Sequence, residues 1–163
     1  MSSDAKDVRS LLVRAAKDEA RRDGSRTIEA EHVLLALAAT ADTEAARMLA
    51  EAGLTEDTIR AALDREWEQS LAVAGIAVRI GLLPMATPDH RRDPHIGEST
   101  KLLLRRAMDA RPKVGAGRMT PLRILVGVLD TERGRVARVL QVAGVDRAAL
   151  RTRVADALAQ GAR

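Results

Sequence analysis

Apolar side chains recur every three or four residues along most of the chain, in short stretches separated by glycine, threonine and aspartate. This spacing is that of helices with one buried face. The first stretch predicts a helix from about Ser3 to Asp23, followed by Gly24, a residue that adopts the left-handed conformation at a helix end cheaply. Its buried face would hold Val8, Leu12, Ala15 and Ala16.

Two further helices are predicted before Gly53. One starts after Thr27 as its N-cap and buries Val33, Leu34 and Leu37. The next starts after Asp42 or Thr43, places Ala45, Leu49 and Ala52 on one face, and ends at Gly53.

A fourth helix has the clearest start. Thr55 is its expected N-cap, and Leu54 and Ile59 occupy the two positions of a hydrophobic staple. Its apolar stripe continues every four residues through Leu63, Trp67 and Leu71, so we expect Trp67 to be buried.

The chain is an internal duplication. An offset of 91 aligns residues 10–63 with 101–154 without a gap, and 14 of these 54 positions are identical. The second half uses different residues for the same helix starts. Thr120 is the expected N-cap of one helix, with Pro121 as its first helical residue, and Asp146 is the expected N-cap of another. We therefore expect one all-α domain over 1–163, made of two four-helix repeats at about 4–73 and 99–160 and a connector at about 74–98.

The connector matches neither repeat. It contains Pro84, Pro88 and Pro94, a composition that predicts an exposed loop. The stretch from Ile76 to Met85 is apolar enough to pack on the helices, as a short helix or as an extended strap. The side chains of Asp89, His90, Asp93, His95 and Glu98 are of metal-binding types, but their spacing fits no zinc pattern and favours a solvated linker, so we expect no metal site.

Composition excludes several classes of protein. The chain has no Cys and one aromatic residue, Trp67, so disulfide frameworks, thiolate metal sites and aromatic stacking platforms are excluded or disfavoured. Met85, Met108 and Met119 are interpreted as core or gap-filling residues. No stretch is long and apolar enough to span a bilayer, and we expect a cytoplasmic protein without membrane partners.

Charge is distributed unevenly between the two halves. Residues 1–82 carry 11 basic and 15 acidic side chains, and residues 83–163 carry 16 basic and 8 acidic ones. The second half could form a basic patch that attracts acidic partners, or its charges could lie on solvated helix faces. The asymmetry also permits head-to-tail self-association. The candidates for the patch are Arg105, Arg106, Arg111, Lys113, Arg118, Arg123, Arg133, Arg135 and Arg138.

Three stretches of the first half carry a family resemblance: AKDEAR at 16–21, IEAEHVLLAL at 28–37, and AARML at 45–49 followed by AGL at 52–54. They resemble the patterns A-x-E-E-A-R, I-G-T-E-H-I-L-L-G-L and A-A-x-x-L-x-x-x-G of the N-terminal repeat domain of the Clp ATPases, and of ClpC in particular. The resemblance covers the whole chain, more weakly in the second half.

The resemblance implies a fold and a function. The fold would be two four-helix repeats related by a pseudo-twofold axis. The function would be the docking of substrates, adaptor proteins, phosphoarginine-marked proteins or peptide-like antibiotics in Clp-dependent proteolysis. The acidic residue of the family's motif contacts the guanidinium of phosphoarginine, and Glu31 occupies that position here. The implied ligand-binding residues are Glu31, His32 and Ala30 in the first half and Leu122 and Arg123 in the second.

Glu31 and His32 also have simpler interpretations. A carboxylate in the first turn of a helix is stabilised by the helix dipole. A histidine at a helix start commonly caps the helix or packs against it, and its neutral form is a modest recognition group. The sequence leaves these alternatives open.

The second half departs from the family pattern. Leu122 occupies the acidic position and cannot accept hydrogen bonds from a guanidinium, and Arg123 beside it would repel one. We therefore expect one phosphoarginine site per chain. The aromatic residue and threonine that the family carries near the start of its first helix are replaced by Ala5 and Lys6, and the connector is longer than usual.

The sequence contains no motif for catalysis. It lacks the phosphate-binding pattern G-x-x-x-x-G-K-[ST] and the nucleophile elbow G-x-S-x-G. The chain ends at Arg163, just past the last expected helix, so we expect no ATPase module to follow. We interpret the protein as a non-enzymatic binding module without a cofactor. The alternative is a small basic helical protein that binds nucleic acid through its second half.

Overall fold

The computed structural model of the chain describes residues 8, 10–110 and 118–161. The first half contains a π-helical turn, η1 (Leu11–Ala15), that runs directly into α2 (Ala16–Arg22), followed by α3 (Ala30–Ala39), α4 (Glu44–Glu51) and α5 (Glu56–Val73). The second half contains α6 (Glu98–Asp109), α7 (Pro121–Leu129), α8 (Arg135–Val142) and α9 (Arg147–Gly161). A 3₁₀ turn, η2 (Ile80–Leu82), lies in the connector. The all-α fold expected from the sequence is confirmed.

The two halves repeat the same helix order. Adding 91 to the bounds of α4 gives the bounds of α8, residues 135 and 142. Helix α3 packs on α8 while α7 packs on α4, which is the reciprocal arrangement that a twofold relation between the halves requires. Gly53 and Gly144, which are 91 residues apart, both adopt positive φ angles of 79° and 71° after their helices.

Most predicted helix starts are confirmed by hydrogen bonds. Thr43, rather than Asp42, caps α4 by accepting from the N–H of Ala46 at 3.1 Å. Thr55 caps α5, Thr120 caps α7, and Asp146 accepts from the N–H of Ala149 at 2.9 Å. The predicted start at Ser3 lies outside the described residues, whereas Gly24 does follow the first helix, at φ 65°.

The prediction that Thr27 caps the second helix is wrong. Thr27 and Ile28 form β1, which pairs in parallel with β2 (His95–Ile96), and Glu29 is the N-cap residue of α3. Because this strand pairing joins residues that are 68 positions apart, nothing in the sequence around Thr27 indicates it. This pairing brings the start of α6 to the start of α3.

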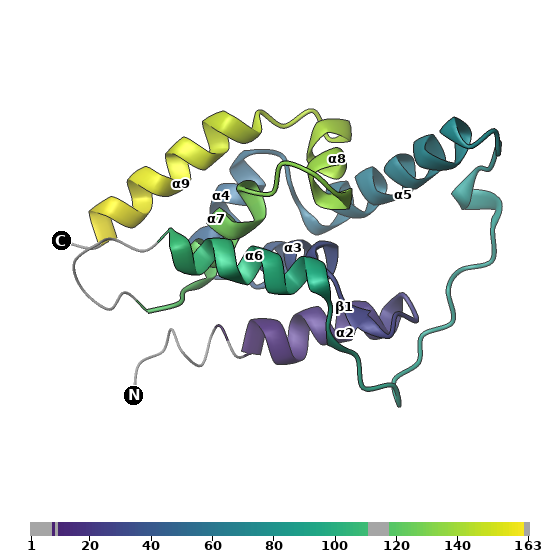
Figure 1. Cartoon of the computed structure of the whole chain (residues 1–163), viewed down its shortest axis with the longest axis horizontal. Coiled ribbons are helices and arrows are strands. Elements are labelled where there is room, and N and C mark those ends of the chain that lie inside the picture. Colours follow the sequence, from purple (N-terminus) through teal and green to yellow (C-terminus); the bar gives the residue numbers. More distant parts are fainter. Residues whose placement is uncertain (1–7, 9, 111–117, 162–163) are drawn as a thin grey trace.

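Helices α3 and α7 form the centre of the core. Every residue from Ala30 to Leu37 and from Leu122 to Leu129 is buried. Gly127 of α7 permits a close crossing with α6, because a Cβ atom at this position would lie 2.2 Å from the carbonyl oxygen of Leu103. Figure 1 shows α3, α6 and α7 in the middle of the molecule, between α2 and α9.

The end of α5 and the connector differ from expectation. Trp67 is 45% exposed, so the prediction of a buried Trp67 is wrong. The stretch from Ile76 to Met85 forms the short helical turn η2 and is joined to α5 by a hydrogen bond from the N–H of Ile80 to Glu68. Most of its apolar side chains are nevertheless exposed: Leu82 is 83% exposed and Met85 is 93% exposed. Met108 is also exposed, at 48%, and only Met119 of the three methionines packs against the core. Figure 1 shows the connector leaving the end of α5 as a long loop along one side of the molecule.

Candidate functional site

The N-terminus of α3 is held by the first turn of α6. The hydroxyl of Ser99 donates to the carboxylate of Glu29 and accepts from the N–H of Ala30 at 2.8 Å. Thr100 donates to the carbonyl of Ile28 at 2.7 Å. Gly97 leaves room for the Glu29 carboxylate, because a Cβ atom there would lie 2.0 Å from Oε1. These bonds fix the direction in which the first turn of α3 presents its side chains.

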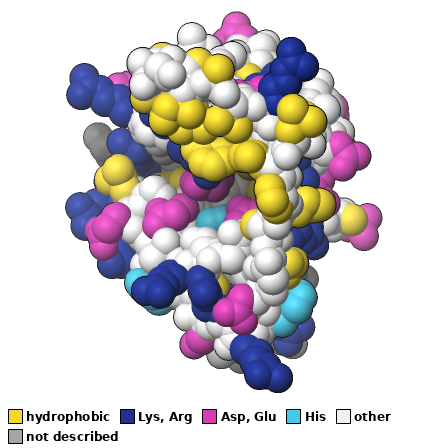
Figure 2. Space-filling view, turned by 90° about the vertical axis from the view of Figure 1, so that its right-hand side faces the viewer, with side chains coloured by type: hydrophobic (Ala, Val, Ile, Leu, Met, Phe, Trp, Pro, Cys, Tyr) yellow, Lys and Arg dark blue, Asp and Glu magenta, His cyan; other side chains and the backbone are white. Residues whose placement is uncertain are grey.

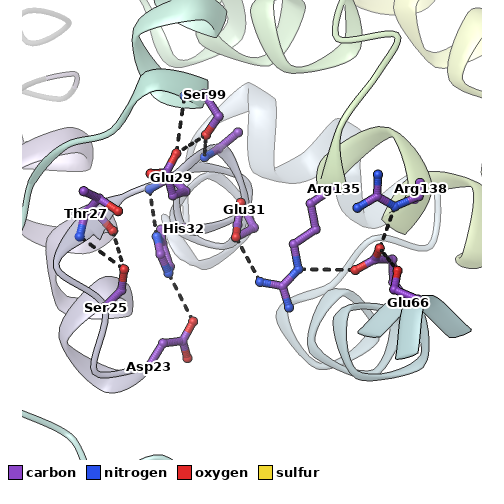
Figure 3. Close-up of polar contacts among 12 residues, drawn as sticks. Asp23, Ser25, Thr27, Glu29, Glu31, His32, Glu66, Ser99, Arg135 and Arg138 are labelled. Carbon is purple, nitrogen blue, oxygen red and sulfur yellow. Dashed lines mark hydrogen bonds and ion pairs between the residues drawn. The ribbon is translucent and has the colours of Figure 1, made fainter. Parts of the chain in front are cut away.

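His32 is a capping residue of this turn (Figure 3). Its Nδ1 accepts from the backbone N–H of Glu29 at 2.9 Å, and its Nε2 lies 3.1 Å from Oδ2 of Asp23. Since Nδ1 accepts a hydrogen bond, the proton of the neutral ring resides on Nε2 and is donated to Asp23. Burial raises the pKa of Asp23, but the hydrogen bond from His32 and the positive charges of Arg60 and Arg135 lower it below its ordinary value. His32 and Ala30 are both buried, at 3% and 4% exposure.

Glu31 joins an ion-pair cluster that connects the two halves. Arg135 of α8 donates from Nη1 to Oε1 of Glu31 at 3.0 Å and from Nε to Oε2 of Glu66 at 3.3 Å. Arg138 donates to the other oxygen of Glu66 at 2.6 Å, and Ser70 donates to the same oxygen at 2.8 Å. We call Glu31, Glu66, Arg135 and Arg138 the cross-repeat cluster. Figure 3 shows it at the junction of α3, α5 and α8.

The cluster combines buried carboxylates with half-exposed guanidinium groups. The Glu66 side chain is 3% exposed and that of Glu31 is 11% exposed, whereas those of Arg135 and Arg138 are 38% and 55% exposed. Burial raises the pKa of Glu66, but the hydrogen bonds from Arg138 and Ser70 and the two positive charges lower it below its usual range. The buried acids therefore hold cations that a ligand can reach from solvent.

The described residues of the second half, 98–110 and 118–161, hold no equivalent cluster. At the offset of 91, Glu31 corresponds to Leu122, which is buried at 7% exposure, and Arg135 corresponds to Glu44. Arg123 is also buried, and its backbone N–H donates to Thr120. Of the five predicted ligand-binding residues, the structure places Glu31, His32 and Ala30 together, while Leu122 and Arg123 lie on the separate helix α7.

The sequence interpretation missed Glu66, Arg135 and Arg138 as partners of Glu31. It gave the two arginines as candidates for a basic patch, with solvated helix faces as the alternative. One signal was available: Glu66 follows Ile59, Ala62 and Leu63 on the buried face of α5, and a carboxylate at such a position requires a cationic or hydrogen-bonding partner.

Many arginines of the second half are engaged within the protein. Arg106 donates to Thr131, Arg147 donates to the carbonyls of Leu129 and Thr131, and Arg151 pairs with Asp130. Arg111 and Lys113, also candidates for the basic patch, lie outside the described residues. Of the contacts above, the Arg151–Asp130 pair neutralises positive charge, and the others hold their guanidinium groups against neutral oxygens.

Two negative findings apply to the described part of the chain. In residues 8, 10–110 and 118–161, no three His, Asp or Glu side chains come together as a metal site would require. Within the same residues, no helix combines the length and the apolar character needed to cross a membrane.

Comparison with known proteins gives a family and a fold. Residues 6–115 match the model of the Clp repeat (R) N-terminal domain. Among solved structures, the chain is similar to the N-terminal domain of the caseinolytic protease associated chaperone ClpD from Arabidopsis thaliana, with 21% identity, 94% of each chain covered and a TM-score of 0.65. At that identity the structural similarity shows the fold alone. The comparison with curated proteins gave no match.

Proposed function

The chain belongs to the Clp repeat N-terminal domain family, and from this premise we propose that it is a non-enzymatic, cytoplasmic module that binds proteins or peptides in Clp-dependent proteolysis. It corresponds to the substrate-binding part of that machinery rather than to the catalytic ATPase domain. Its ligands are substrates, adaptors, phosphoarginine-marked proteins or peptide-like antibiotics.

The contact between Glu31 and Arg135 carries this proposal. Glu31 stands at the acidic position of the family motif and already accepts a hydrogen bond from a guanidinium group. The first turn of α3 therefore presents a carboxylate with the geometry that an arginine-derived ligand needs. Glu31 is the proposed ligand-binding residue, and Ala30 and His32 support it by fixing the turn.

Arg135 acts in this proposal as an internal competitor. A ligand guanidinium reaches Glu31 only after Arg135 has left it. Arg135 can leave without becoming unpaired, because Glu66 also accepts from its Nε at 3.3 Å. Arg135 would then remain on Glu66, and the phosphoryl group of phosphoarginine would lie close to the half-exposed Arg138, whose positive charge suits it. Because the competing guanidinium belongs to the same chain, we expect wild-type binding to be weak.

Calorimetric titration with free phosphoarginine tests the proposal. We expect saturation near one ligand per chain, tighter binding by Arg135→Ala than by the wild type, and no binding by Glu31→Gln. Arg153→Ala is the matched control, because Arg153 forms a salt bridge to Glu51 away from this cluster. Its affinity should equal that of the wild type.

Two results would count against this site. One is the absence of heat at millimolar ligand in both the wild type and Arg135→Ala, with each protein shown to be folded by thermal melting. The other is equal binding by Glu31→Gln and the wild type. The second half offers no acidic counterpart, so Leu122→Glu tests whether a carboxylate alone creates a second site next to Arg123. We expect it to bind no additional ligand.

A further inference from the structure

Arg135 lies among four carboxylates rather than only the two that it contacts. Glu31 and Glu66 accept its hydrogen bonds at 3.0 and 3.3 Å. Its positive charge also acts on Asp23, which directly follows α2, and on Asp64 of α5. We call Asp23, Glu31 and Asp64 the acidic rim of the Glu31 site. Figure 3 shows Asp23 and Glu31 on the side of α3 where the Arg135 guanidinium lies, and Figure 2 shows acidic side chains around a histidine in the middle of one face.

Asp23 is stabilised by a cation at the place that Arg135 occupies. Burial raises the pKa of Asp23, but the hydrogen bond from His32 and the positive charges of Arg60 and Arg135 lower it below its ordinary value. The ring of His32 is neutral when it donates to Asp23, so it fixes the direction of the carboxylate without cancelling its charge. The Asp23 side chain is 46% exposed, and a ligand can therefore reach it.

Asp64 is an exposed carboxylate that forms no hydrogen bond or ion pair with another residue of 8, 10–110 and 118–161. Partial loss of hydration and the negative charges of Glu68 and Asp23 raise the pKa of Asp64, and the positive charges of Arg135 and Arg60 do not reverse this rise. The charge of Asp64 is therefore not balanced by the cations near it.

The acidic rim gives the Glu31 site an excess of negative charge. Its three carboxylates and that of Glu66 face two guanidinium groups, those of Arg135 and Arg138, so two negative charges are left over. Arg60 does not supply the difference, because it already forms ion pairs with two other glutamates. Arg65 and Glu68 of α5 carry opposite charges and cancel each other. The site therefore favours a ligand that brings positive charge.

Phosphorylation changes the charge that an arginine ligand brings. An unmodified guanidinium carries one positive charge, whereas a phosphoryl group adds about two negative charges at neutral pH. Arg138 compensates these charges only in part, because its Nε already donates to Glu66 at 2.6 Å. We propose that the Glu31 site favours the unmodified arginine side chain of a polypeptide over phosphoarginine, and that Asp23 and Asp64 set this preference. The inference rests on the proposed function and names the ligand class of the same site.

Arg135→Ala is the host protein for the test, because this substitution removes the internal competitor from Glu31. The probes are the N-acetyl amides of arginine and phosphoarginine, which differ only in the phosphoryl group. In calorimetric titrations at low salt, we expect the arginine compound to bind at least about tenfold more tightly than the phosphoarginine compound. The preference should shrink as the salt concentration rises. The N-acetyl amide of lysine should bind more weakly than that of arginine, because an ammonium group lacks the planar fork of a guanidinium.

Two substitutions in this host each remove one charge of the acidic rim. Asp23→Asn retains an oxygen that can accept from His32, so the turn stays capped, and Asp64→Asn changes an exposed side chain. Each should reduce the preference for arginine over phosphoarginine by about two- to fivefold. Asp156→Asn is the matched control, because this exposed aspartate lies on α9, which packs on α7 and α4. It should leave the preference unchanged.

The outcomes separate this inference from the proposed function. Equal or tighter binding of the phosphoarginine compound by Arg135→Ala would overturn the inference and leave the proposed function intact. An unchanged preference in both asparagine variants would also overturn it. Arginine binding that survives Glu31→Gln in the same host would place the ligand elsewhere and contradict both. If neither compound binds to the host, shown to be folded by thermal melting, the proposed function fails and the inference fails with it.

Discussion

Arg135 of α8 donates to Glu31 of α3 at 3.0 Å across 104 positions of sequence, and the same guanidinium reaches Glu66 of α5 at 3.3 Å. One side chain of the second repeat therefore satisfies two buried carboxylates of the first. This contact makes the cross-repeat cluster both a joint between the halves and the place where a guanidinium ligand would compete.

The two arginines of the cluster should protect Glu66 jointly. Arg135→Ala or Arg138→Ala leaves the other cation in place, so we expect each to lower the free energy of unfolding by about 1 kcal/mol. The double variant leaves Glu66 buried and without either arginine, and we expect a loss that exceeds the sum of the single losses by at least about 1 kcal/mol. Urea unfolding of the four proteins measures this coupling. Additive losses would show that the arginines act independently.

Acid should weaken the protein partly through Glu66. Its pKa is lower in the folded chain than the ordinary value of 4.5, so its contribution to stability is present above that value and is lost as pH falls through the folded pKa. We expect the free energy of unfolding to decrease from about pH 5 downward. Glu66→Gln should be less stable at pH 7 and show a shallower decrease in acid. Equal slopes for both proteins in urea titrations would contradict this assignment.

Asp64 should behave in the opposite sense. Partial loss of hydration and the negative charges of Glu68 and Asp23 raise the pKa of Asp64 above 3.8. The folded chain therefore binds this proton more tightly than the unfolded chain, and the ionised carboxylate opposes folding at neutral pH. We therefore expect Asp64→Asn to melt at a higher temperature than the wild type at pH 7. The difference should disappear at about pH 3, where the wild-type carboxyl is protonated in both states. Asp57→Asn is the control: it removes a carboxylate from the first turn of the same helix and should lower the melting temperature slightly.

Local chemistry in the sequence predicted most of the helices. The side chains of Thr43, Thr55, Thr120 and Asp146 each hydrogen-bond to a backbone N–H within the next three residues, so the residue type and its position indicate the helix start. The errors arose where the determining partner is distant. Thr27 looked like a cap but pairs with His95, and Glu31 is paired by Arg135, a residue that no local pattern connects with it.

Trp67 illustrates a second limit of sequence interpretation. Its spacing after Ile59 and Leu63 correctly places it on the apolar stripe of α5, but a stripe is buried only as far as a neighbouring helix extends. Because Trp67 is 45% exposed, we expect acrylamide to quench its emission substantially, but less efficiently than that of a free tryptophan derivative. Strong protection from acrylamide would mean that another part of the protein or a second copy covers the Trp67 side chain. Measurements at two protein concentrations distinguish these alternatives.

Gly127 should be essential to the crossing of α6 and α7. Alanine is ordinarily the better helix former by about 1 kcal/mol, so an exposed helical glycine gains stability on this substitution. At position 127 the new Cβ atom would lie 2.2 Å from the carbonyl oxygen of Leu103 and 3.1 Å from Cβ of Ala107, and both neighbours belong to a packed helix. We expect the helices to separate and Gly127→Ala to lower the free energy of unfolding by about 1–3 kcal/mol. Gly161→Ala in α9 is the matched control, because nothing lies within 4 Å of its Cβ position, and it should be neutral or stabilising. The first repeat carries Ala36 at the equivalent position of α3, so this tight crossing belongs to the second repeat. If Gly127→Ala and Gly161→Ala were equally stable, α6 would be able to move away from α7 at no cost in free energy.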